Sequence, residues 1–546
     1  MSLPDGIIRD RTRQYGVTDD PFMWLDGSFQ YAENLNVFDD PRGIKLTTWW
    51  TKSATYKACK LVSAGDYFVS IPSSAWNVSK IDPASRPTGT TIWTVPSGLT
   101  PYDAVIFNWA VAVIWVKSDA RAGIYFYDIG GGWQVTRIPV DNSGDTPVIM
   151  WNQDTSLWEL TPPYCSCICN LNNSMLLVWN GNYLWVYNPA EDAGSLYASW
   201  WKIVKRYSWE CNIVEISPKA DYVEIFIEDG YWNTKIHYYP WIFDMEDSGL
   251  MKSVDLPNTR IQRVYPHMTK EMVVISLDGS NNNVSLREVI GYDTYPVMRS
   301  HRAWLSPYDV QHKLGFFTWP CGYDMAWYDG RAYVADVEWI REFSRYDANK
   351  MPVGNLRWKF NDESDDKTPF GLAIAKDFIM ASYNDYAYLT RIYDTAKPYG
   401  YAEEWMLISR AIETEYGGEF TKQLVRWITQ FEMNNLTDDN GTIDIYVCGN
   451  RERNSPDDDC WIKIAHIAQA DADFVDEGET SSTWLTQYSI GTCVHRFDNA
   501  WDRWYMRDRQ VIEYKIVIKR WSESNASPVL RSLLLEYDVK EKTNYF

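Results

Sequence analysis

An apolar or aromatic residue followed by Asp or Asn recurs seven times along most of this chain of 546 residues. The copies are Ile81-Asp82, Tyr127-Asp128, Tyr187-Asn188, Phe243-Asp244, Tyr292-Asp293, Tyr346-Asp347 and Tyr393-Asp394. Their mean spacing is 52 residues. A unit of this length with up to four short strands is typical of a propeller blade. The repeat predicts a β-propeller-like domain of six or seven blades over residues 51–405.

Pairs of apolar runs joined by turn residues lie upstream of these copies. The clearest pair is Met175 to Trp179 and Tyr183 to Tyr187, joined by Asn180-Gly-Asn182. Asn-Gly suits a tight hairpin because it supplies the positive φ angles that the turn requires. Similar turns occur at Glu228-Asp229-Gly230, Asp278-Gly279 and Asp329-Gly330. Aromatic-Asp pairs are common in any chain with 37 Tyr, so the hairpins carry the prediction, and the alternative is an irregular multi-sheet β protein.

The stretch from Phe370 to Asp394 marks the end of the repeat. Lys376-Asp377 and Tyr383-Asn-Asp385 break its apolar runs, which predicts consecutive β-hairpins and the last blade. Residues 1–50, upstream of the repeat, are predicted to form an N-terminal arm. If the blades close into a ring, a strand from the chain before Asp82 should lie beside this last blade.

Longer strands separated by acidic loops replace the period after the repeat. The expected strands are Leu424 to Met433, Thr442 to Val447, Trp461 to Ile467, Val511 to Ile518 and Leu530 to Tyr537. They predict an antiparallel β-sandwich over residues 406–546. Aromatic residues make up 16% of the chain and favour strands over helices, so the predicted fold class is all-β.

The formal net charge is −21, so the average surface is acidic. Such a surface repels nucleic acid and anionic membranes at long range, which argues against a protein that grips DNA. Residues 1–16 hold no apolar run of the kind that a signal peptide needs. The longest apolar stretch, Ala104 to Val116, is shorter than the ~20 residues of a membrane span. Nine scattered cysteines fit reduced thiols in a chain made in the cytosol.

The sequence designates no catalytic, cofactor-binding or metal-ligating residue. The six histidines show no metal-ligand spacing, and they are His237, His267, His301, His312, His466 and His495. Cys165, Cys167 and Cys169 alternate, so in a strand they share one face, which favours packing over a metal site. Acidic clusters at Asp362 to Asp366, Asp438 to Asp444 and Asp457 to Asp459 lack the full calcium loop and are expected to be solvated turns. We therefore expect no cofactor and a non-enzymatic role.

The C-terminal stretch resembles the end of tail nozzle or tail hub proteins of short-tailed bacteriophages, the family that includes tail tubular protein B. The resemblance lies in Trp504 to Gln510, Val511 to Ile518, Ser527-Pro-Val-Leu530 and Leu533 to Tyr537, with Asp444 to Val447 and Trp461 to Lys463 upstream. The N-terminal Ala32 to Val37, followed by Gly43-Ile-Lys45, is similar to the opening of those proteins. Together these pieces cover about a quarter of the chain.

This resemblance implies a virion protein of the tail, assembled in the host bacterial cytoplasm, that forms a homo-oligomeric ring, a hexamer. The ring would surround the DNA exit channel, between the adaptor and portal on one side and a distal fibre or spike on the other. It would retain the packaged genome and guide its ejection, and DNA would pass an acidic lumen without specific binding. Membrane insertion is not expected.

Two other functions remain open from the residues. A receptor- or carbohydrate-binding propeller of the phage tail would use exposed Trp side chains. The chain has 29 Trp in total. A carbohydrate-cleaving propeller enzyme would need only two carboxylates that meet in space, and carboxylates are abundant.

Overall fold

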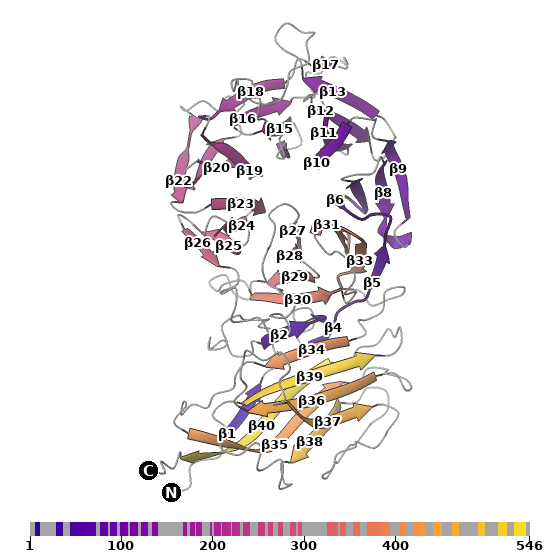
Figure 1. The fold of residues 1–546 in the computed structure, drawn as a ribbon, viewed down its shortest axis with the longest axis vertical. Helices are drawn as coiled ribbons and strands as arrows, with labels where there is room; N and C mark the ends of the chain where they lie inside the picture. The colour runs from indigo at the N-terminus through magenta and orange to yellow at the C-terminus, as the bar shows by residue number, and fades with distance from the viewer. Residues whose placement is uncertain are drawn as a thin grey trace.

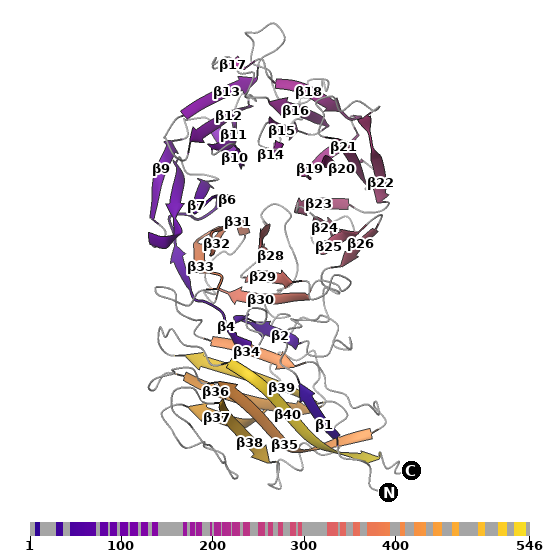
Figure 2. The same cartoon turned by 180° about the vertical axis from the view of Figure 1, so that it is seen from behind.

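The structure is a computed structural model. It describes residues 6–10, 29–36, 44–72, 77–85, 88–94, 99–107, 110–117, 122–128, 134–139, 167–171, 175–180, 182–187, 197–198, 201–208, 210–219, 221–229, 233–240, 249–256, 260–265, 271–276, 284–290, 293–296, 325–336, 339–344, 353–360, 369–393, 404–409, 420–432, 441–449, 461–468, 490–496, 512–520 and 529–541. These residues form a ring of sheets and, beside it, a body of long strands (Figures 1 and 2).

Seven blades, each with four antiparallel strands among the described residues, follow one another around the ring. Blade 1 contains β6 (Cys59–Ala64), β7 (Tyr67–Pro72), β8 (Asn77–Asp82) and β9 (Thr88–Thr94), with the 3-10 helix η1 (Pro83–Ser85) before β9. Blade 2 contains β10 (Leu99–Phe107), β11 (Ala110–Lys117), β12 (Ala122–Asp128) and β13 (Gln134–Pro139), and β17 (Tyr197–Ala198) adds to it in parallel. Blade 3 contains β14 (Cys167–Leu171), β15 (Met175–Asn180), β16 (Tyr183–Tyr187) and β18 (Trp201–Arg206).

The remaining four blades repeat this order. Blade 4 contains β19 (Asn212–Pro218), β20 (Tyr222–Glu228), β21 (Thr234–Pro240) and β22 (Lys252–Leu256). Blade 5 contains β23 (Arg260–Tyr265), β24 (Glu271–Ser276), β25 (Val284–Ile290) and β26 (Asp293–Pro296). Blade 6 contains β27 (Met325–Tyr328), β28 (Arg331–Asp336), β29 (Trp339–Ser344) and β30 (Val353–Lys359). Blade 7 contains β31 (Pro369–Ala375), β32 (Phe378–Tyr383), β33 (Ala387–Arg391) and, from far upstream, β5 (Trp50–Ser53).

The repeated dipeptide of the sequence marks the third strand of every blade. Asp82 ends β8, Asp128 ends β12 and Tyr187 ends β16. In blades 4 to 7 the third strand ends two or three residues before the dipeptide. Asp and Asn favour turns because their side chains hydrogen-bond to nearby backbone. The predicted propeller is confirmed, and each dipeptide corresponds to one of the seven blades.

The hydrophobic core of the ring lies between neighbouring blades. One buried cluster joins β15 and β16 of blade 3 to β19, β20 and β21 of blade 4, and another joins blades 6 and 7. In the middle strands, runs such as Leu176 to Trp179 are buried without alternation. Both faces of a blade are covered by the next blade, which explains why these strands read as continuous apolar runs.

The turns of the hairpins take the backbone conformations that their residues favour. Asp329 and Gly330 have φ angles of 49° and 73°, as the Asp-Gly pair between β27 and β28 predicts. Gly65, between β6 and β7, has a φ of 63°.

The second body consists of two sheets and is the C-terminal β-sandwich of the predicted fold class. One sheet continues blade 6 through β2 (Phe29–Glu33), β34 (Glu404–Ser409), β39 (Ile512–Arg520), β36 (Gly441–Gly449) and β37 (Ile462–Ala468). The other contains β3 (Leu35–Asn36), β4 (Ile44–Leu46), β40 (Val529–Glu541), β35 (Phe420–Glu432) and β38 (Ile490–Arg496), and β1 (Gly6–Asp10) pairs with β40. The strands β1 to β4 of the N-terminal arm are therefore built into the sheets of the second body.

Two further observations bear on expectations from the sequence. Cys448 is disulfide-bonded, so the expectation of reduced thiols is wrong for this residue. Scattered spacing misled here because a disulfide depends on the distance between two Cα atoms in space and not along the chain. Among the residues that the structure describes, no helix has the length and apolarity of a membrane span.

Candidate functional site at the closure of the ring

The ring closes by pairing the first strand of the propeller with its last blade. Trp50, Thr51, Lys52 and Ser53 pair antiparallel with Thr390, Leu389, Tyr388 and Ala387. β5 is thus the outermost strand of blade 7, although more than 300 residues separate the two partners. The prediction that a strand from the chain before Asp82 lies beside the last blade is confirmed.

The turn after β5 fastens blade 7 to blade 1. The Ala58 amide donates to the Tyr383 carbonyl oxygen at 2.7 Å. The Ser382 hydroxyl accepts from the Cys59 amide and donates to the Tyr56 carbonyl oxygen, both at 2.9 Å. Ser382 is fully buried. A single serine therefore satisfies two backbone groups that would otherwise be buried without partners.

The innermost strands of blades 7 and 1 approach each other at the backbone. A Cβ atom at Gly371 in β31 would lie 2.6 Å from the Cys59 carbonyl oxygen and 2.7 Å from the Leu61 nitrogen in β6. The Ser63 hydroxyl of β6 also donates to the Ile374 carbonyl oxygen of β31. This seam has room only for a glycine at position 371.

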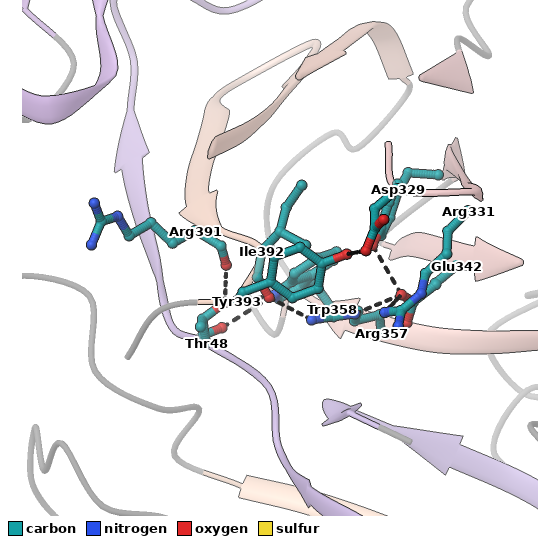
Figure 3. A network of polar contacts seen from close by, with 10 residues as sticks. Thr48, Asp329, Arg331, Glu342, Arg357, Trp358, Arg391, Ile392 and Tyr393 are labelled. Atoms are coloured by element: carbon teal, nitrogen blue, oxygen red, sulfur yellow. Dashed lines mark hydrogen bonds and ion pairs between the residues drawn. The ribbon is translucent and has the colours of Figure 1, made fainter. Parts of the chain in front are cut away.

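The segment that leads into β5 crosses a buried corner between blades 6 and 7. The Thr48 carbonyl oxygen accepts from the Trp358 indole nitrogen of β30 at 3.1 Å. The Thr48 hydroxyl donates to the Arg391 carbonyl oxygen at the end of β33, as Figure 3 shows. The Thr390 hydroxyl donates to the Trp49 carbonyl oxygen at 2.5 Å. The segment is therefore hydrogen-bonded to both blades.

A cluster of charged side chains lies in the same corner. Glu342 Oε1 accepts from Arg357 at 2.6 Å, from the Tyr333 hydroxyl at 2.9 Å and from Arg331 at 3.0 Å. Glu342 and Arg357 are fully buried. Arg357 also donates to the Ile392 carbonyl oxygen at 2.5 Å, so it joins blade 6 to blade 7 (Figure 3).

Charge and aromatic stacking support this cluster. The Arg357 guanidinium lies 4.7 Å from the centre of the Trp358 ring, within the range of a cation–π interaction. On the rim, the Tyr393 hydroxyl donates to Asp329 at 3.0 Å. Removing two charges from water is costly, and the contacts of Arg357 with Glu342 and with the Ile392 carbonyl oxygen offset part of that cost while they join blade 6 to blade 7.

The structure describes only some of the His, Cys and Asp residues that were considered above as metal ligands. His237 lies half-buried in β21 beside the rings of Tyr207 and Tyr239. Asp444 forms an ion pair with Lys463 at 2.7 Å. His466 and His495 lie in β37 and β38, and Cys167 and Cys169 lie in β14. The residues outside the described part are His267, His301, His312, Cys165, Asp362 to Asp366, Asp438 to Asn440 and Asp457 to Asp459.

No group of three His, Cys, Asp or Glu side chains in the described part of the chain is arranged to hold a metal ion. The residues that the sequence analysis missed are those of the closure corner, above all Glu342 and Arg357. Glu342 and Arg357 lie in β29 and β30 among other polar residues, so the sequence gives no signal for a buried pair.

A second buried ion pair lies at the turn between β19 and β20 in blade 4. Lys219 Nζ is 3.8 Å from a carboxylate oxygen of Glu224, and both side chains are 5% exposed. Burial raises the pKa of Glu224, opposed by the attraction of Lys219 and Lys252. Burial lowers the pKa of Lys219, opposed by Glu224.

Substituting Glu224→Gln should change how stability depends on pH. With a raised pKa, the folded chain keeps a proton on Glu224 over an interval in which the unfolded chain has released it. The contribution of Glu224 to stability is therefore present at low pH and is lost as pH rises through that interval. Above about pH 4, where an ordinary glutamate loses its proton, the free energy of unfolding of the variant should rise with pH relative to the parent chain.

Denaturant titrations at several pH values would measure this difference. Asp221→Asn, which removes an exposed carboxylate from the same turn, controls for the loss of a charge alone. A difference between Glu224→Gln and the parent that stays constant with pH would contradict the prediction.

The thiol of Cys59 should resist alkylation in the folded chain. Burial raises its pKa to about 12, and only the thiolate is a good nucleophile. Cys211 is a free and half-buried thiol. With iodoacetamide at neutral pH, peptide mass spectrometry should find Cys211 modified before Cys59, and denaturant should make the two rates similar. Equal rates in the folded chain would contradict this expectation.

Comparisons with known proteins leave the family open. No family model matches the chain, and no curated protein matches it. A solved structure of BamB from Moraxella catarrhalis is similar over 72% of this chain and 98% of its own, with 11% identity and a TM-score of 0.34. The WD40 β-propeller domain of Doa1 is similar over 63% of this chain and 96% of its own, with 8% identity and a TM-score of 0.35. A chain of the mitotic checkpoint complex is similar over 68% of this chain and 94% of its own, with 9% identity and a TM-score of 0.38.

Proposed function

We propose that the chain is a structural protein of a bacteriophage virion, a nozzle or hub subunit of a short tail. Several copies, six by the family resemblance, would form a ring around the DNA exit channel. The ring would lie between adaptor or portal proteins and a distal fibre or spike, retain the packaged genome and then guide its ejection. The role is geometric and non-enzymatic.

The observation that carries the proposal is where the two resembling stretches lie. The N-terminal stretch contains β3, which pairs with β4, and β4 pairs with β40 of the C-terminal stretch. In the other sheet, β2 pairs with β34, and β34 pairs with β39. Stretches from opposite ends of the sequence thus belong to one body. If both stretches resemble parts of one domain, they must lie together in the fold, whereas two chance similarities need not.

Charge and connectivity agree with this role. A net charge of −21 disfavours tight contact between the protein and DNA phosphates, which suits a wall that DNA must pass. Blade 6 continues through β2 into the sandwich as one sheet, so the propeller is attached by backbone hydrogen bonds. An attachment of the propeller to the sandwich suits a subunit that lines a channel.

Electron microscopy and light scattering of the purified full-length chain would test the proposal. We expect closed rings of several copies with a central opening, and the same protein in purified virions by mass spectrometry. A chain that stays monomeric at high concentration and is absent from virions would overturn it. Binding to a glycan array that depends on Trp side chains would instead favour the receptor-binding alternative.

A further inference from the structure

One continuous segment, residues 44–53, belongs to both bodies of the molecule. Its first part is β4, where Ile44 and Lys45 pair with Leu530 and Val529 of β40 in the sandwich. Its last part is β5, the strand that closes the propeller. Only three residues separate the two strands, and Figure 1 shows the chain running directly from β4 to β5. We call residues 44–53 the strap.

The three residues between the strands are held throughout. The Thr47 amide donates to the Asn34 carbonyl oxygen at 2.8 Å, and Thr47 and Thr48 are buried. The hydroxyl oxygens of Thr48 and Thr390 are 2.9 Å apart. Three residues span at most about 10 Å when fully extended. A displacement of β4 is therefore passed to β5, because the linker is short and pinned.

The closing strand β5 depends on the preceding part of the strap for its position. β5 is only four residues long, and in the described part of the chain it pairs with one strand, β33. A short strand of this kind is marginal by itself and needs support from packing or tethering. Its support includes two aromatic contacts of Trp50. The ring centres of Trp49 and Trp50 are 4.1 Å apart in a stacked arrangement, and those of Trp50 and Phe360 are 5.2 Å apart in an edge-to-face arrangement.

Blade 6 has its own link to the sandwich. Glu33 of β2 pairs with Leu356 of β30, and the Lys359 amide donates to the Asn34 side-chain oxygen at 2.7 Å. This link holds blade 6, whereas the strap holds β5, the outermost strand of blade 7. The two links therefore have different consequences when the sandwich changes.

We propose that the strap is a conformational coupling device by which the sandwich controls closure of the propeller. A change that loosens β4 from β40 releases β5 from β33, the pairing that closes the ring. The effect is reciprocal, since loosening β5 weakens the pairing of β4 by the same coupling free energy. The inference concerns this chain by itself and holds whether or not the protein is a tail subunit.

Hydrogen exchange of the full-length chain tests the coupling. Leu530 is fully buried and pairs with Ile44, so Leu530→Ala removes packing beside β4. We expect amide exchange in both β4 and β5 to rise about tenfold, as a loss of local stability predicts. Exchange in β15 and β16 of blade 3 should not change. Should the variant fail to fold, Leu530→Val gives the same test with a smaller cavity.

Three further variants separate coupling from general destabilisation. Ile443→Ala makes a cavity at a buried position of β36, in the other sheet, and should leave β5 exchange unchanged. Thr390→Val removes the hydroxyl that holds Trp49, and it should raise exchange in β4. Inserting Gly-Ser-Gly-Ser between Leu46 and Thr47 uncouples the two strands, so it should raise exchange in β5 by itself, and Leu530→Ala in the inserted chain should raise exchange in β4 without a further rise in β5. Fast exchange in β4 with parental exchange in β5 in the Leu530→Ala chain would overturn the proposal, as would an insertion that leaves exchange in β5 slow.

Discussion

Replacing Glu342 by alanine is expected to lower the free energy of unfolding by about 3–5 kcal/mol, the usual cost of removing one partner from a buried ion pair. The substitution leaves Arg357 fully buried without its carboxylate. It also removes the acceptor of the Tyr333 hydroxyl and of Arg331. Denaturant unfolding of the full-length chain would measure the loss.

A double variant distinguishes the pair from its surroundings. Replacing Glu342 and Arg357 together by methionine removes both buried charges and keeps much of the volume. Such replacements are often neutral or stabilising, so the double variant should be clearly more stable than Glu342→Ala. The prediction is contradicted if Glu342→Ala costs less than about 1 kcal/mol, which is the effect of an ordinary substitution.

Much of the ring could be predicted because each blade leaves a local signature. The turn at Asp329-Gly330 adopts the positive φ angles that its residues favour. The Asp or Asn of the repeat ends or follows the third strand in all seven blades. These signals depend on neighbours within a few residues, and so they survive in a single sequence.

The pairing of the N-terminal strands could be predicted only in part. Closure of a propeller brings the start and the end of the repeat together, which is why the sequence predicts a strand from the start of the chain beside the last blade. No such rule places β1 against β40 or β2 against β30. These pairings join residues hundreds of positions apart, through five residue pairs for β1 and β40 and a single residue pair for β2 and β30. The sequence pattern also did not predict β38.

The closure corner left no pattern to read. Glu342 and Arg357 lie in different strands, and each alone resembles a charge on an exposed face. The pair forms only where β29 and β30 lie side by side, and Arg357 is bound in addition by the Ile392 carbonyl oxygen of blade 7. Alternation within a strand predicts which residues share a face, but it does not predict that a charged face will be covered by a distant segment.

Replacing Gly371 by alanine is expected to cost about 3 kcal/mol, the upper part of the usual range for overpacking. The new Cβ would lie 2.6 Å and 2.7 Å from backbone atoms of Cys59 and Leu61, closer than real Cβ atoms come. Neither atom belongs to a side chain that can turn away. The first strands of blades 7 and 1 must therefore move apart, which loosens the seam. Hydrogen exchange should be faster in β31 and β6 and unchanged in β20.

Gly89 provides the matched control, because a Cβ there meets a side chain and not the backbone. Its nearest neighbour would be the Tyr56 hydroxyl oxygen. Tyr56→Phe removes that atom, so Gly89→Ala should be better tolerated in the Tyr56→Phe chain than in the parent. Tyr56→Phe should give no comparable relief to Gly371→Ala. If Gly371→Ala unfolds with the stability of the parent, the backbones of β31 and β6 are not in close contact at the seam, and the prediction is wrong.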